Sequence, residues 1–92
     1  MKGGINYIMI KCGKGEIGNP KFRIGDRVGF YLNTNGMETF FIGTVYIVDS
    51  YGTFEQNEEP SYDIMVKDWL GSGEDILVKH HRESWCFVLD EF

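Results

Sequence analysis

Short runs of β-forming residues follow one another along the chain, and in the clearest of them apolar and polar positions alternate. Val28, Phe30 and Leu32 fall on one side of such a run, and residues 62–67 repeat the pattern. Alternation with a period of two is typical of strands with one buried face. No stretch from residue 22 onward keeps a helical period over three turns, so we predict an all-β chain. The other predicted strands are residues 5–10, 38–48, 76–80 and 85–89.

Asparagine and glycine residues indicate how the first of these strands are connected. The sequence NTNG at residues 33–36 predicts a hairpin, because asparagine and glycine tolerate a positive φ. Gly43 lies in the middle of the long run 38–48 and has no side chain to pack. It predicts a bend or bulge at which the strand curls, as a small barrel requires.

The second half of the chain contains a long polar loop and a short polar turn. Residues 49–61 form the loop, and Pro60 ends it because proline cannot donate a hydrogen bond to a strand ladder. The sequence HRES at residues 81–84 predicts a single tight turn. In the strand that follows, we expect Trp85 and Phe87 to be buried on one face.

Four segments carry a family resemblance: GDRV, GTVYIV, YDIMV and ILVKHHRESW. In this order they resemble SH3-like barrels of the Tudor and KOW kind, and more closely the small SH3-like proteins of bacterial prophages and mobile elements. The resemblance covers residues 22–90 and implies a small SH3-like barrel of about five strands within residues 22–92. Residues 1–21 would add an N-terminal strand and a glycine-rich loop. Such barrels bind peptides, modified tails, RNA or larger assemblies, so the resemblance implies a binding module without specifying its chemistry.

Composition and charge narrow the range of partners. The 92 residues suffice for one small core, and 14 acidic against 9 basic residues give a net charge of −5. This charge disfavours a nucleic-acid backbone as partner. Cys12 and Cys86 lack a pairing motif and indicate free thiols rather than a secreted disulfide framework. With no signal peptide and no stretch near the roughly 20 apolar residues that span a bilayer, we expect a soluble, cytoplasmic protein.

Two motifs that suggest catalysis or cofactor binding lack the surroundings that this chemistry needs. GKGEIG at residues 13–18 fits the dinucleotide pattern G-x-G-x-x-G, but a proline follows where the phosphate site needs a helix N-terminus. Ser84, His81 and Glu83 are the residue types of a hydrolase triad, yet residues so close in sequence do not converge in that geometry. We expect no catalytic residue and no cofactor.

The histidine pair His80 and His81 is the remaining candidate for chemistry. Adjacent strand residues point to opposite faces, so the two side chains cannot easily bind one metal ion. We expect one histidine to pack or to hydrogen-bond and the other to be solvated, and we predict no metal site.

The long loop carries the candidate binding surface. Acidic and aromatic side chains share it, and together they could hold a basic peptide or a methylated ammonium group, although surface acids are commonly only solvated. We predict a non-catalytic module that recognises a protein or peptide through Tyr51, Phe54, Glu55, Glu58, Glu59 and Trp69. For Trp69 a second interpretation is equally open, in which the ring is buried and caps the core.

Two alternatives come from other classes of protein. One is RNA or DNA binding through Lys79, His80, His81 and Arg82, with an aromatic platform such as Tyr31 or Tyr46. The other is an obligate homodimer in which residues 5–10 pair edge to edge with a second copy.

Overall fold

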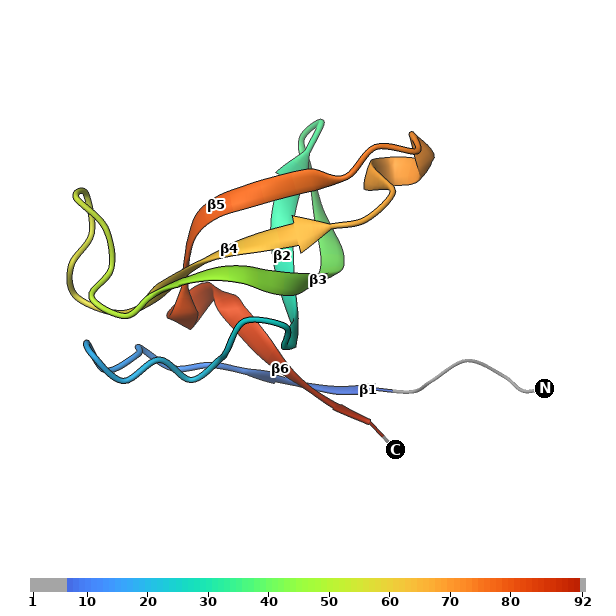
Figure 1. The fold of residues 1–92 in the computed structure, drawn as a ribbon. Helices are drawn as coiled ribbons and strands as arrows, with labels where there is room; N and C mark the ends of the chain where they lie inside the picture. The colour runs from blue at the N-terminus through green and yellow to red at the C-terminus, as the bar shows by residue number, and fades with distance from the viewer. Residues whose placement is uncertain (1–6, 92) are drawn as a thin grey trace.

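The computed structural model describes residues 7–91, which form one six-stranded antiparallel sheet (Figure 1). The strand order across the sheet is β1-β6-β2-β3-β4-β5. The prediction of an all-β chain is confirmed, and no helix within residues 7–91 is long and apolar enough to cross a bilayer. The elements are β1 (Tyr7–Lys11), β2 (Arg27–Thr34), β3 (Met37–Asp49), β4 (Ser61–Val66), β5 (Ile76–Arg82), β6 (Cys86–Glu91) and the single 3₁₀ turns η1 (Trp69–Gly71) and η2 (Glu83–Trp85).

The hairpin of β2 and β3 turns where the sequence predicts it. Thr34 pairs with Met37, and the two residues between them have positive φ, 53° at Asn35 and 84° at Gly36. The Gly36 N–H donates to Asn33 Oδ1 at 2.9 Å. Two central residues with positive φ match the twist of the flanking strands, which is why an asparagine and a glycine stand here.

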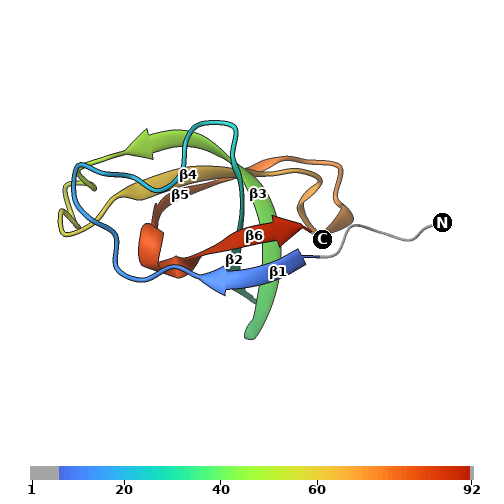
Figure 2. The ribbon, with the colours of Figure 1, turned by 90° about the horizontal axis from the view of Figure 1, so that it is seen from below.

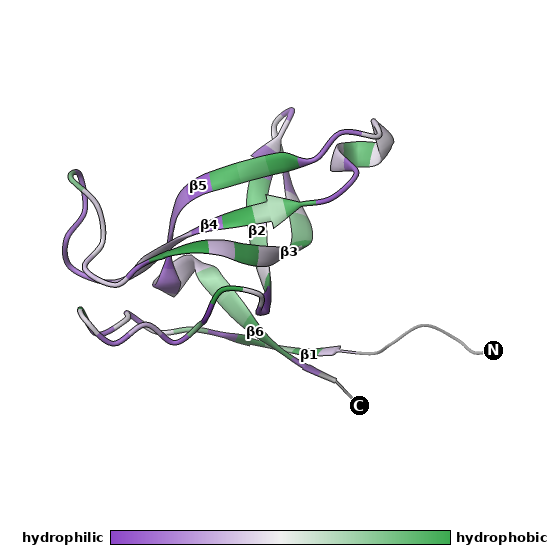
Figure 3. Ribbon diagram, in the orientation of Figure 1, coloured by the Kyte–Doolittle hydropathy of each residue, from purple (hydrophilic) through white to green (hydrophobic). Residues whose placement is uncertain are grey.

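The core lies inside the curl of this sheet. Figures 1 and 2 show β6 and β1 lying across from β4 and β5, and buried side chains fill the space between them. In Figure 3 the hydrophobic colour is concentrated on the strands. Both cysteines are buried as free thiols. The core residues are Cys12, Phe22, Val28, Phe30, Phe41, Val45, Tyr62, Ile64, Val66 and Cys86.

The irregularity in β3 lies farther along the strand than the sequence predicts. The register with β4 shifts between Val45 and Ile47 and not at Gly43. Gly43 is buried, and a Cβ at this position would come within 2.8 Å of the Met65 carbonyl oxygen. The glycine is therefore required by the close approach of β4 rather than by a bend.

The first strand begins at Tyr7 in the structure. Ile5 and Asn6, with which the predicted strand starts, lie outside the described residues. β1 lies at one edge of the sheet, where it pairs with β6 alone, and Ile8 and Ile10 are about half exposed.

Candidate functional site

Two rings of the predicted binding surface stand out from the protein on the loop between β3 and β4. Phe54 has a relative exposure of 107% and Tyr51 of 72%. Glu55 and Glu58 beside them are also exposed, and Glu58 forms an ion pair of 3.1 Å with Lys14. Figure 3 shows this loop as mostly hydrophilic, with a hydrophobic position at its tip. Four of the six predicted residues therefore share one surface, which we call the loop surface: Tyr51, Phe54, Glu55 and Glu58.

Hydrogen bonds inside the loop fix its conformation. The Gln56 side chain accepts from the backbone N–H groups of Glu58 at 2.7 Å and Glu59 at 2.9 Å, and it donates to the Glu59 carbonyl oxygen at 3.0 Å. The Thr53 N–H donates to the Gln56 carbonyl oxygen at 2.6 Å. Gly52 has a φ of 74°, and a Cβ there would collide with the Gln56 carbonyl oxygen. The exposed rings are thus carried by an ordered backbone.

Glu59 lies beneath this surface, which corrects its predicted place on it. Its relative exposure is 1%. Oε1 accepts from the backbone N–H of Gly15 at 3.0 Å and of Ser84 at 2.9 Å, and Oε2 accepts from the Ser84 hydroxyl at 2.7 Å. Burial favours the neutral acid, but these hydrogen bonds and the charge of Arg82 outweigh it and lower the pKa of Glu59. Its carboxylate joins the segment around Gly15 to η2 at Ser84 and is not available to a partner.

A second buried carboxylate, Glu83, ties the chain before β2 to β4. Its Oε1 accepts from the Tyr62 hydroxyl at 2.7 Å and from the Lys21 N–H at 2.9 Å. The Tyr62 oxygen in turn accepts from the Phe22 N–H at 3.2 Å. Burial and the bond to Glu83 raise the pKa of Tyr62. We call Glu59, Tyr62 and Glu83 the buried seam.

The buried seam also explains the glycine-rich motif at residues 13–18. Gly15 is buried, and a Cβ there would collide with the Glu83 carboxylate and come within 2.8 Å of Pro60 Cδ. A glycine stands at this position because two buried groups occupy the space of a side chain. The motif serves packing, in a segment that runs without a helix into β2.

Trp69 is separated from the loop surface by the length of β4. The loop precedes β4 and Trp69 follows it in η1, at opposite ends of the strand in Figure 1. Its ring is partly buried and stacks on Phe41 at a centroid distance of 4.7 Å and an angle of 12°. Trp69 therefore caps the core at the other end of the molecule and does not belong to the loop surface.

The two histidines differ as predicted, one packed and one solvated. His81 is buried, with its ring 4.9 Å from Phe30 and 5.2 Å from Trp85. Desolvation lowers the pKa of His81 to about 4. The His80 side chain is 58% exposed. The structure also corrects the prediction that Trp85 is buried with Phe87, because Trp85 is 50% exposed.

The predicted basic patch does not form a continuous surface. With His81 inside, Lys79 and His80 are its exposed members. Arg82 is half-buried, 3.9 Å from the Glu59 carboxylate and with its guanidinium 5.5 Å from the Trp85 ring centre. The two suggested stacking platforms, Tyr31 on β2 and Tyr46 on β3, lie on strands that do not pair with β5. The residues of the nucleic-acid alternative are therefore dispersed.

An aromatic cluster on the outer face of the sheet was missed by the sequence analysis. The rings of Tyr31, Phe40 and Phe87 contact one another edge to face at centroid distances of 5.0, 5.6 and 5.8 Å. Gly29 leaves room for them, since a Cβ there would collide with the Phe40 ring. They come from β2, β3 and β6, and only the strand register brings them together.

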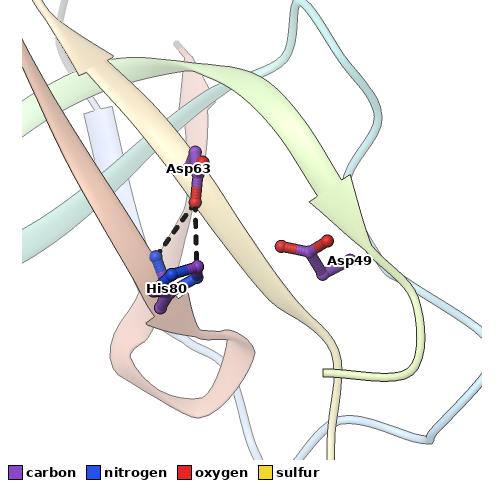
Figure 4. A group of neighbouring side chains, drawn as sticks. All are labelled: Asp49, Asp63 and His80. Carbon is purple, nitrogen blue, oxygen red and sulfur yellow. Dashed lines mark hydrogen bonds and ion pairs between the residues drawn. The ribbon is translucent and has the colours of Figure 1, made fainter. Parts of the chain in front are cut away.

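Three potential metal ligands that the sequence does not group also meet in the fold. Asp49, Asp63 and His80 come from β3, β4 and β5, and their ligand atoms all lie within 4.8 Å of one another (Figure 4). The backbone N–H of His80 donates to Asp63 Oδ1 at 3.0 Å, and the imidazole Nδ1 of His80 is 3.8 Å from the same oxygen. We call these residues the Asp-Asp-His cluster. The histidine was considered only with its neighbour in sequence, whereas the structure pairs it across the sheet.

Comparison with protein-family models, curated proteins and solved structures finds no match for this chain.

Proposed function

We propose that β2 to β6 form a small SH3-like barrel to which β1 adds a strand. The strand order β6-β2-β3-β4-β5 supports this, because the last strand returns to pair with the first of the five. A single 3₁₀ turn, η2, connects β5 to β6, and a register shift lets β3 curve. Both are devices by which a short sheet closes on itself.

We further propose that the protein is a non-catalytic binding module that recognises a protein or peptide through the loop surface. The observation that carries this proposal is the exposure of Phe54 and Tyr51, 107% and 72%, on a loop held by internal hydrogen bonds. A large apolar ring in water gains free energy when a partner covers it. An ordered loop loses little conformational entropy on binding, so more of that gain appears as affinity.

Charge indicates the kind of partner. Glu55 and Glu58 lie beside the rings, and the whole chain carries a net charge of −5. Both favour a basic segment and speed its approach. The aromatic rings would provide most of the affinity, because ion pairs in water contribute little.

The test is affinity capture from the source organism with the wild type and the double variant Tyr51→Ala/Phe54→Ala. We expect the double variant to lose the partner and to keep the thermal midpoint, since both rings are solvent-exposed. The control removes two other exposed apolar side chains, Ile24→Ala/Met37→Ala, at 70% exposure each, and should retain the partner.

Two results would contradict the proposal. One is a folded double variant that captures the same proteins as the wild type. The other is a partner that disappears on nuclease treatment, which would favour nucleic acid and move attention to Lys79 and His80. Self-association through β1 stays a prediction, and sedimentation of the captured protein with its partner would report it in the same experiment.

A further inference from the structure

We propose that the Asp-Asp-His cluster binds a divalent transition-metal cation. Its two carboxylates and one imidazole lie within 4.8 Å of one another (Figure 4). These are ligand types that Zn²⁺ and Mn²⁺ accept in proteins. The proposal is independent of the loop surface and departs from our expectation of no metal, which considered only the two adjacent histidines.

The charges of the cluster suit a cation. The Asp63 side chain is 7% exposed, and its carboxylate lies within 4.8 Å of that of Asp49. Within residues 7–91, neither carboxylate forms an ion pair with a lysine or arginine, and the imidazole of His80 is charged only when protonated. Two neighbouring carboxylates repel each other, and burial strengthens the repulsion. A divalent cation between the two carboxylates would offset their repulsion.

An unpartnered hydroxyl next to the cluster supports the same conclusion independently. Ser61 is 1% exposed, and its Oγ has no hydrogen-bond partner among residues 7–91. Ser61 pairs directly with Asp49 and stands two residues before Asp63, so all three side chains lie on one face of the sheet. A buried hydroxyl without a partner is costly. A metal ion here, or a water molecule bound to it, would provide that partner.

The strand register places Asp49 on β3 and His80 on β5, one on each side of Asp63 on β4. The β3–β4 register shifts between Val45 and Ile47, and the β4–β5 register shifts between Tyr62 and Ile64. At the second shift His80 adopts a φ of 57°, unusual for a residue other than glycine, and its backbone turns toward Asp63. The cluster is thus built into the sheet rather than carried by a loop.

The geometry allows the ligands to close around an ion. Two ligands on one tetrahedral Zn²⁺ are separated by roughly 3.4 Å, given bond lengths near 2.1 Å. His80 Nδ1 is 3.8 Å from Asp63 Oδ1, close to this separation, and the His80 side chain is 58% exposed. Three protein ligands leave at least one position for water or for a group of a partner.

Isothermal titration of the tag-free protein with Zn²⁺, and separately with Mn²⁺ followed by electron paramagnetic resonance, tests the proposal. Mn²⁺ is included because it prefers oxygen ligands such as the two carboxylates over soft thiolates, so binding at the thiols Cys12 and Cys86 would not be mistaken for this site. We expect one ion per chain. The variant His80→Asn should weaken binding of both ions at least tenfold, and asparagine tolerates the positive φ at this position.

A second pair of variants keeps the test decisive if His80→Asn is poorly folded. Asp49→Asn should also weaken binding at least tenfold, whereas Asp90→Asn, which removes an exposed carboxylate on β6, should leave it unchanged. The proposal is overturned if the wild type binds neither ion stoichiometrically, or if folded His80→Asn and Asp49→Asn bind as tightly as Asp90→Asn.

Discussion

The loop surface and the buried seam contain the same kinds of side chain and meet at a single peptide bond. Glu58 is exposed and ion-paired with Lys14, whereas Glu59 is 1% exposed and accepts three hydrogen bonds. The same contrast recurs at the next pair of neighbours, where His80 is exposed and His81 is buried. Neighbouring residues of one type therefore have different roles in this protein. Glu58 and His80 face solvent, whereas Glu59 and His81 are buried inside the fold.

The difference follows from the environment of each carboxylate. An exposed glutamate exchanges water for a partner at little gain, so its removal changes the free energy of unfolding little. A buried glutamate has already lost its water, and its donors have no other acceptor. Substitutions on the loop surface should therefore cost little stability, whereas substitutions in the buried seam should cost much. Three predictions test this contrast, from the largest effect to the smallest.

The largest effect should come from Glu59→Ala. The change leaves the N–H groups of Gly15 and Ser84 and the Ser84 hydroxyl without an acceptor, and it uncovers Arg82. We expect the free energy of unfolding to fall by roughly 4 kcal/mol. Urea denaturation at pH 7 measures it, and a loss below about 1 kcal/mol would show that the seam does not hold these segments.

A second, smaller effect should appear with pH. The pKa of His81 is about 4 in the folded protein against 6.5 for an ordinary histidine, so below pH 6.5 the unfolded chain binds a proton that the folded chain does not. Stability should therefore fall as the pH drops from 6.5 to 4, by about 2 to 3 kcal/mol. The contribution of Glu59, whose pKa is lowered, is lost only below its ordinary value of 4.5.

A variant without the buried histidine identifies the source of this pH dependence. Urea denaturation between pH 7 and pH 4.5 should give a much shallower profile for His81→Phe, in which a third ring joins Phe30 and Trp85. The control Ile24→Phe adds a ring at an exposed position and removes no titratable group, so it should keep the wild-type slope. An unchanged slope in folded His81→Phe would assign the pH dependence to other groups.

The smallest effect should come from Glu58→Ala, the direct counterpart of Glu59→Ala. Its carboxylate is 65% exposed, and Lys14, its partner, is 62% exposed. We expect a change of less than about 0.5 kcal/mol in the free energy of unfolding. The same variant should slow association with a basic partner, as measured by surface plasmon resonance at low salt. A stability loss comparable to that of Glu59→Ala would remove the contrast between the two regions.

Part of the candidate site could be predicted from the chain. The exposure of Tyr51, Phe54, Glu55 and Glu58 follows from a long polar loop, because loops run over the surface. Glu59 and Trp69 were assigned to the same surface because they are close in sequence or of the same residue type. Neither criterion reports on burial or on which end of a strand a residue occupies.

The sequence by itself determined the local features of this protein. Period-two alternation, the asparagine-glycine turn and the proline before β4 predict strands and their ends, because each acts through the backbone of a few neighbouring residues. The tertiary structure alone decided which side chains meet across strands. The buried seam, the aromatic cluster and the Asp-Asp-His cluster all depend on strand order and register, in which a shift of one residue moves every side chain to the other face.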